Sequence, residues 1–181
     1  PNVRDEASGV LDIQMYVEDP VPNVRDEASG VLDIQMYVDY LCPICGQFEA
    51  TNGEYISSLL ENGGTTVEIH PIAILDRLSQ GTKYSTRAVN AAACVADMSP
   101  NQFYDFHNQL FANQPAENTT GLTDEEIIAL TVAAKVDNAD KIASCIKDQS
   151  FKAWETAATA RALNGPIPNS NVDKVTGTPT V

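Results

Sequence analysis

Cys42 and Cys45, with Pro43 and Ile44 between them, form a C-x-x-C motif. Two thiols at this spacing can carry out disulfide exchange, or they can supply half of the ligands of a zinc site. Pro43 suits the first position of a helix, because the N–H that proline lacks has no helical partner there, so Cys42 is expected at the N-cap. Free N–H groups and the positive end of the helix dipole favour a thiolate at that position. We therefore predict Cys42 as the nucleophile and Cys45, on the same helical face, as the resolving thiol.

A strand and a helix must flank this motif if the thiols are to be placed in this way. Residues 31–38 alternate apolar and polar side chains and predict a strand. After the motif, apolar residues recur at helical spacing up to the Asn-Gly-Gly stop at 62–64. Residues 65–69 alternate again, and a right-handed crossover would place this second strand parallel to the first. The pattern predicts a βαβ unit.

Helix signals then dominate the chain as far as residue 166. Helices are expected to start at Ser85, at Ser99-Pro100 and at a capping box over 123–126. Asn138 is expected to cap another helix that runs through Cys145. A last helix is expected over 151–163, before an Asn-Gly-Pro stop at 164–166. Together they predict a helical insertion that fills about half of the chain. The last segment, 172–181, is β-prone and contains Pro179.

Residues 1–17 recur without change as residues 22–38. Solenoids need at least three repeats, which normally differ from one another, so this copy is more typical of a recent duplication or an assembly error. The first copy runs into Pro20 and Pro22, so it is expected to supply at most an edge strand or a swapped strand. The second copy leads into the C-x-x-C motif and should take the central position in the sheet.

The overall composition restricts the classes of partner. The 181 residues suit one domain with a real core. A formal charge of −14 would repel nucleic acids and anionic membranes, so we expect proteins or small molecules as partners. The sequence contains no apolar run of membrane-spanning length and its start lacks the features of a signal peptide, so any targeting or anchoring segment is expected to have been removed.

Four segments of the chain resemble the DsbA-like thiol-disulfide oxidoreductases, particularly those of actinobacteria. They are 37–49 around the C-x-x-C motif, 70–77, 84–87 and the Gly-Thr-Pro-Thr-Val sequence of 177–181. The resemblance spans 31–181 and implies an α/β, thioredoxin-like fold with a helical insertion between the βαβ unit and a cis-proline strand. It also implies that Pro179 is cis and faces the active cysteines, and that the backbone of Thr178 pairs with an extended substrate strand. Without the resemblance, a trans proline in a turn is the ordinary alternative.

The residue patterns and the resemblance together divide the chain into four parts: 1–21, a duplicated segment of uncertain role; 22–75, the βαβ unit; 76–166, the helical insertion; and 167–181, the cis-proline loop and strand. Family members continue beyond that strand with further elements, so the last part is expected to be truncated. One face of the sheet would then be uncovered, and the duplicated strand could pair with the gap or with another molecule. Strongly oxidising members also carry histidine where this chain has Ile44. Since isoleucine cannot donate to a thiolate, we expect a less depressed pKa for Cys42 and a less oxidising disulfide.

Several of the remaining cysteine, aspartate and histidine residues allow more than one interpretation. Cys94 and Cys145 lie far apart in predicted helices, which disfavours a zinc site; they are predicted to form a structural disulfide in an oxidising compartment, with buried free thiols as the alternative. Asp39 is either a proton relay for Cys45 or a solvated carboxylate at the strand end. His70 and His107 are predicted to be structural.

These observations together predict an extracytoplasmic thiol-disulfide oxidoreductase of bacterial type that donates the Cys42–Cys45 disulfide to reduced client proteins, without a cofactor or metal. The predicted location is the cell envelope or the outside of the cell, and the full-length protein is expected to be either secreted or membrane-anchored. The resemblance also implies reoxidation by a membrane quinone-linked partner of the DsbB or vitamin K epoxide reductase type. A thioredoxin-like reductase or isomerase, and a non-catalytic module that binds zinc or protein, are the alternatives.

Overall fold

A computed structural model describes residues 32–62 and 65–181. The first repeat copy, and with it the predicted edge or swapped strand, lies outside these residues. The elements, with 3-10 helices written η, are in chain order β1 (Leu32–Val38), α1 (Pro43–Glu61), β2 (Thr65–Pro71), η1 (Asp76–Leu78), α2 (Tyr84–Met98), η2 (Pro100–Gln102), α3 (Phe103–Ala112), α4 (Asp124–Ala133), α5 (Ala139–Asp148) and α6 (Lys152–Asn164).

The predicted βαβ unit is confirmed. β1 and β2 are parallel and pair in register from Leu32 opposite Thr65 to Val38 opposite Pro71. On its other edge, β1 forms one antiparallel bridge, in which Tyr37 and Thr180 exchange two backbone hydrogen bonds. β1 therefore has the central position expected for the second repeat copy, and the C-terminal segment reaches the sheet through this bridge.

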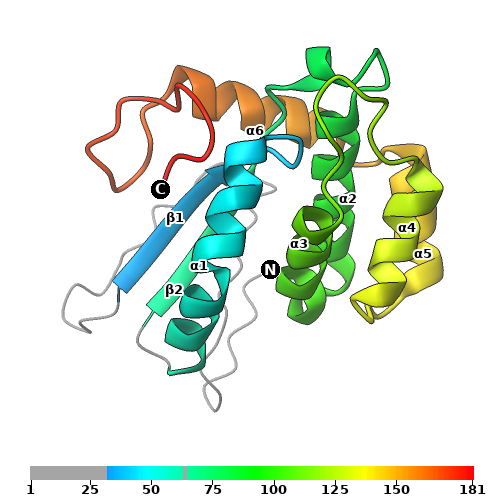
Figure 1. Cartoon of the computed structure of the whole chain (residues 1–181), viewed down its shortest axis with the longest axis horizontal. Coiled ribbons are helices and arrows are strands. Elements are labelled where there is room, and N and C mark those ends of the chain that lie inside the picture. Colours follow the sequence, from blue (N-terminus) through cyan, green and yellow to red (C-terminus); the bar gives the residue numbers. More distant parts are fainter. Residues whose placement is uncertain (1–31, 63–64) are drawn as a thin grey trace.

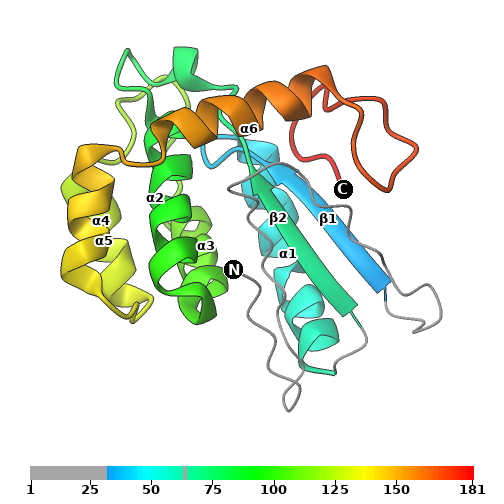
Figure 2. The same ribbon diagram turned by 180° about the vertical axis from the view of Figure 1, so that it is seen from behind.

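The two faces of β1 contact different parts of the core, because neighbouring side chains of a strand point to opposite faces. Met36 and Val38 are fully buried in the main cluster, together with residues of α1 to α5. Tyr37 points to the other face and joins a second cluster with Ile72 and Ala162 of α6. Figures 1 and 2 show α1 and α6 on opposite sides of the two strands. The junction of β1 and α1 is thus fixed from both faces of the sheet.

The helical insertion packs around α2, which contacts α3, α4, α5 and α6 (Figure 1). Its packed faces are lined with small side chains, which let neighbouring helices approach closely. Buried alanines of this helix are Ala88, Ala91, Ala92 and Ala93. The capping box predicted before α4 is confirmed, since Thr123 and Glu126 each accept a hydrogen bond from the other's backbone N–H.

The first turns of α2 and α5 differ from the helix starts predicted from the sequence. α2 begins one residue before Ser85, after Lys83 in the left-handed region, and the Ser85 hydroxyl instead donates to Asp39. Asn138 does precede α5, but its side chain donates to the carbonyl of Met98 and does not cap the helix. Both side chains make tertiary contacts, which local sequence signals do not register. None of the helices in the described part of the chain is both long enough and apolar enough to cross a bilayer.

Candidate active site

The two thiols of the C-x-x-C motif lie at the start of α1, as predicted. Cys42 is the N-cap residue with extended backbone angles, Pro43 follows at the first helical position, and the N–H of Gly46 donates to the Cys42 carbonyl at 3.2 Å. Both cysteines are free thiols, and their residues are 6% and 0% exposed. A sulfur that is almost buried but still reachable at a helix N-terminus suits a selective nucleophile.

The predicted substrate-binding pair lies beside the first thiol, although 136 positions separate Cys42 from Thr178 in the sequence. The Sγ of Cys42 is 3.2 Å from the carbonyl oxygen of Thr178. The peptide bond between Thr178 and Pro179 is cis. The bridge between Tyr37 and Thr180 holds this segment against β1, so the same strand that leads to the C-x-x-C motif also positions the proline loop.

The environment separates the pKa values of the two thiols. The pKa of Cys42 is lowered to about 5, chiefly because the Cys45 thiol donates a hydrogen bond to it. Thr178 and the backbone N–H groups of Cys45 and Ile44 lower it further, whereas burial opposes them. The pKa of Cys45 is raised, because its proton is held by the Cys42 sulfur and because it is buried. Ile44 contributes its backbone N–H, while the residue as a whole is 56% exposed.

This pKa difference predicts a pH dependence of the reduced protein. The pKa of folded Cys42 lies below the ordinary thiol value of 9.0, so the thiolate stabilises the reduced fold fully above that value, and the contribution is lost as the pH falls through about 5. The disulfide form has no such thiolate. We expect the stability of the reduced form relative to the oxidised form to decrease as the pH falls from about 9 to about 5. Urea unfolding of both forms and the ultraviolet absorbance of the thiolate measure this; the opposite slope would contradict it.

Asp39 is fully buried at the end of β1. Its carboxyl group accepts hydrogen bonds from the backbone N–H groups of Leu41, Ile74 and Leu75 at 2.8, 2.8 and 3.0 Å, and from the Ser85 hydroxyl at 2.7 Å. Burial raises the pKa of Asp39, and these four donors partly offset the rise. The reading of Asp39 as a solvated strand-end carboxylate is therefore wrong. The carboxyl group fixes the loop between β1 and α1 against η1 and α2.

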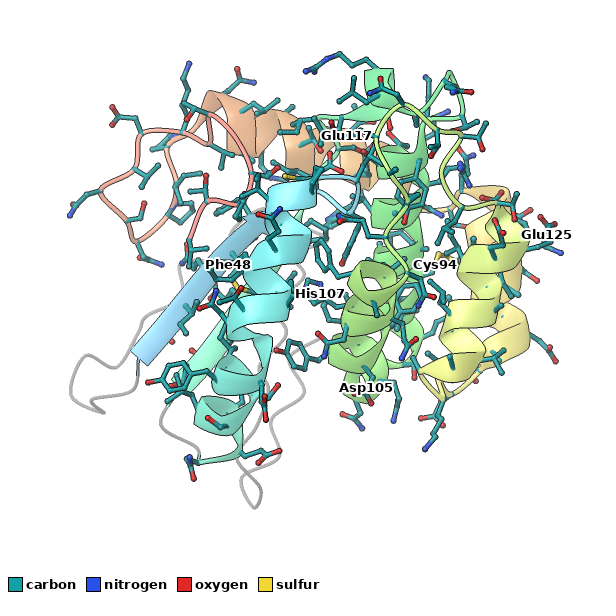
Figure 3. The ribbon with its side chains drawn as sticks, viewed as in Figure 1. Phe48, Cys94, Asp105, His107, Glu117 and Glu125 are labelled. Atoms are coloured by element: carbon teal, nitrogen blue, oxygen red, sulfur yellow. A yellow bond between two sulfur atoms is a disulfide. The ribbon has the colours of Figure 1, made fainter. Side chains whose placement is uncertain are left out.

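The two histidines have structural partners. His107 is fully buried between α1 and α3 (Figure 3), where its Nδ1 is 3.1 Å from the Tyr40 hydroxyl and its Nε2 is 3.2 Å from the Glu49 carboxylate. His70 stacks on Tyr37. Sequence reasoning missed Glu49, although its place one helical turn after Cys45 was a usable signal.

Gln114 is the second residue that sequence reasoning missed. It follows α3, and its side-chain amide donates to the carbonyls of Tyr40 and Cys42 at 3.0 and 2.9 Å. No local pattern indicates this contact, because 72 positions separate Gln114 from Cys42. The N-cap of α1 therefore receives hydrogen bonds from the helical insertion as well as from its own helix.

Cys94 of α2 and Cys145 of α5 are joined by a disulfide, with their Cα atoms 6.0 Å apart. Figure 3 shows Cys94 on the side of α2 that faces α4 and α5. Since their sulfurs are bonded to each other, these cysteines cannot complete a tetrathiolate site with Cys42 and Cys45. Within residues 32–62 and 65–181, no group of three or more His, Cys, Asp and Glu side chains is placed to hold a metal ion.

Known proteins share this fold. Residues 27–181 match the family model described as Thioredoxin. The chain is similar to the reduced form of the disulfide bond oxidoreductase DsbG from Mycobacterium tuberculosis, with 33% identity and a TM-score of 0.64 over 73% of this chain and 69% of that chain. It is also similar to oxidised DsbA from the same organism, with 36% identity and a TM-score of 0.64 over 71% and 66% of the two chains. MdbA, a thiol-disulfide oxidoreductase from Actinomyces oris, has the same fold at 22% identity, with a TM-score of 0.66 over 84% and 70% of the two chains.

The curated relatives are longer proteins. The serine/threonine-protein kinase PknE of Mycobacterium tuberculosis is 35% identical over 113 residues, which are 59% of this chain and 19% of the kinase. The chain thus matches about a fifth of the length of the curated relatives. The match of residues 27–181 to the Thioredoxin family model shows that the chain belongs to the thioredoxin family, and its similarity to DsbA and DsbG shows that it is DsbA-like.

Proposed function

We propose that this protein oxidises client proteins outside the cytoplasm by transferring the Cys42–Cys45 disulfide to them. A client thiolate attacks the Cys42 sulfur, a client–Cys42 disulfide forms, and Cys45 leaves as a thiolate that takes up a proton. A second client thiolate then attacks the client sulfur and releases the Cys42 thiolate. The client gains a disulfide, and the cysteine pair gains two electrons.

The observation that carries this proposal is the position of the Cys42 sulfur at the N-cap of α1, 3.2 Å from the Thr178 carbonyl, where its pKa is lowered. A thiol of low pKa is a good leaving group, so the second step of the transfer is fast. A stabilised thiolate also favours the reduced pair over the disulfide, which makes the disulfide an oxidant. Both effects arise from the N-cap position and from the Cys45 thiol.

Client binding is assigned to the backbone of Thr178 beside Pro179. The Thr178 carbonyl lies 3.2 Å from the Cys42 sulfur, so an extended client segment that pairs there would bring its own cysteine to the nucleophile. The proton for Cys45 is assigned to Asp39. Burial raises the pKa of its carboxyl group, and its backbone N–H faces the Cys45 sulfur.

An extracytoplasmic location fits the chemistry of the chain. The Cys94–Cys145 bridge is of a kind that persists in oxidising compartments. Each turnover leaves two electrons on the cysteine pair, so a partner must remove them. A membrane quinone-linked enzyme of the DsbB or vitamin K epoxide reductase type is the proposed acceptor. The formal charge of −14 disfavours nucleic acid as a partner.

Equilibration with glutathione and refolding of a reduced client with several cysteines test the proposal together. We expect a reduction potential between about −200 and about −120 mV, together with stoichiometric recovery of client activity by the oxidised protein. A potential near about −270 mV would favour the reductase alternative, and failure to oxidise any client would refute the proposal.

In the same client assay, Asp39→Asn should slow the step in which Cys45 leaves the disulfide, because asparagine cannot supply a proton to the Cys45 thiolate. An unchanged rate would refute the role of Asp39 as a proton relay.

The similarity to PknE favours one second function. A thioredoxin-fold segment that matches 19% of a kinase is consistent with a redox-sensing domain attached to a signalling protein. Such a domain would equilibrate with glutathione through the same cysteines. It would leave a reduced client unoxidised over the time in which an oxidase completes the reaction, so the client assay distinguishes the two functions.

A further inference from the structure

Gln114 connects the helical insertion to the backbone that carries the nucleophile. Its Nε2 donates to the carbonyl of Tyr40 at 3.0 Å and to the carbonyl of Cys42 at 2.9 Å. The Cys42 carbonyl also accepts the N–H of Gly46 at 3.2 Å, the hydrogen bond that closes the first turn of α1. One half-buried amide group therefore holds the turn that leads into the helix and the N-cap itself.

Gly46 provides the space that Gln114 occupies. A Cβ atom at Gly46 would collide with the Oε1 of Gln114 and would lie 3.2 Å from its Cδ. Gly46 is within α1 and is not among the glycines with positive φ, so its backbone conformation does not require glycine. Glycine is a poor helix former. The glycine at this position is therefore explained by the contact with Gln114.

The orientation of the Cys42 backbone decides which groups face its sulfur. The N–H groups of Ile44 and Cys45 favour the thiolate, and they can do so only while the N-cap geometry directs them at the sulfur. Because the Gln114 amide binds the carbonyl of the same residue, it restricts rotation of the N-cap. We propose that Gln114 is a positioning residue for Cys42, and that Gly46 is its steric partner. This proposal rests on the proposed disulfide exchange and adds a contact from the helical insertion that controls its nucleophile.

Replacement of Gln114 by methionine tests the proposal, because methionine keeps most of the volume and removes both donors. We expect the pKa of Cys42 to rise by about one unit in the reduced protein. The equilibrium with glutathione should shift about tenfold toward the disulfide form, which corresponds to a potential lower by about 30 mV. Gln114→Glu, which places an acceptor against two carbonyls, should have a larger effect in the same direction. Asn113→Ala is the matched control, since the neighbouring Asn113 is exposed and donates to its own helix at Gln109; it should change neither quantity.

Gly46→Ala supplies the second arm of the test. In the wild-type background the new methyl group should displace the Gln114 amide and reproduce the effects of Gln114→Met. In a Gln114→Ala background the methyl group meets no obstacle, so it should cause no further shift and should raise the melting temperature, because alanine favours the helix. Non-additivity of this kind identifies a direct contact.

An unchanged pKa of Cys42 in Gln114→Met, or additive effects of the two substitutions, would overturn the proposal. The pKa is measured on the reduced protein by thiolate absorbance and by the rate of alkylation, neither of which needs a client. A wild-type chain that fails to oxidise clients would therefore refute the proposed function, while the role of Gln114 in positioning Cys42 could still be tested by these two measurements.

Discussion

Replacement of Cys42 by serine should abolish disulfide transfer to a reduced client while the protein stays folded, with a rate lower by roughly a thousandfold or more. Serine cannot form the disulfide that the first step requires. Cys45→Ser should behave differently, because Cys42 then keeps its sulfur but has no partner thiol to release it from a mixed disulfide. This variant should accumulate a covalent adduct with a disulfide-containing client. Client refolding and the intact mass of the adduct measure the two outcomes.

Gln47→Ala is the control for both variants, because Gln47 is exposed on the same helix and has no assigned role. It should retain the wild-type rate of transfer. The reverse pattern, in which Cys45→Ser is inert and Cys42→Ser forms the adduct, would assign the nucleophile to Cys45. Transfer by both serine variants at the wild-type rate would remove the C-x-x-C motif from the reaction.

The helix α1, which carries the C-x-x-C motif at its start, could be predicted from the sequence because its signals are local. Alternation over 31–38 and Pro43 after Cys42 together predict a strand that leads into a helix with a sulfur at its N-cap. The structure places β1 and α1 at these residues. The same alternation excludes a register of β2 that is shifted by one residue, since such a slip would move the buried side chains to the wrong face.

The surroundings of the thiols could not be predicted in this way, because they are formed by contacts between distant segments. An acid at position 39 was visible in the sequence, but its donors at Ile74, Leu75 and Ser85 appear only in the fold. Gln114 lies in a loop without any pattern that connects it to Cys42. The approach of Thr178 to Cys42 was expected from the resemblance to a known family, since 136 positions separate the two residues.

The pKa of Cys42 shows how local residues and contacts between distant segments each affect the thiol, and Ile44 is the local residue concerned. The resemblance to the DsbA-like family implies that a histidine donor is missing at this position, and so predicts a less depressed pKa for Cys42. In the structure the main donor to the Cys42 sulfur is the Cys45 thiol, and the pKa of Cys42 is lowered to about 5. The residue between the cysteines is therefore one of several influences on the thiolate. Its effect relative to the strongest oxidants of the family stays a prediction that the reduction potential will decide.

Replacement of both Cys94 and Cys145 by alanine should lower the free energy of unfolding by about 4 kcal/mol, because the disulfide closes a long loop in the unfolded chain. The two residues are 51 positions apart, and they connect α2 to α5. For a protein of this size the loss corresponds to a melting temperature lower by about 10 °C. The measurement is urea and thermal unfolding of the variant and the wild type. The double substitution is needed, since a single free thiol could exchange with Cys42.

Ser144→Ala is the matched control, because Ser144 is beside Cys145 and donates within its own helix; it should change stability by less than about 0.5 kcal/mol. The double variant should keep the reduction potential of Cys42 and Cys45, because the groups that face these sulfurs belong to α1, the end of β1 and the Thr178 segment. Unchanged stability would show that packing of α2 against α5 already holds the insertion together. A large change in the reduction potential would instead mean that loss of the disulfide affects the two thiols through α2. The hydrogen bond from Ser85 to Asp39, which connects α2 to the end of β1, is the contact that would transmit the effect.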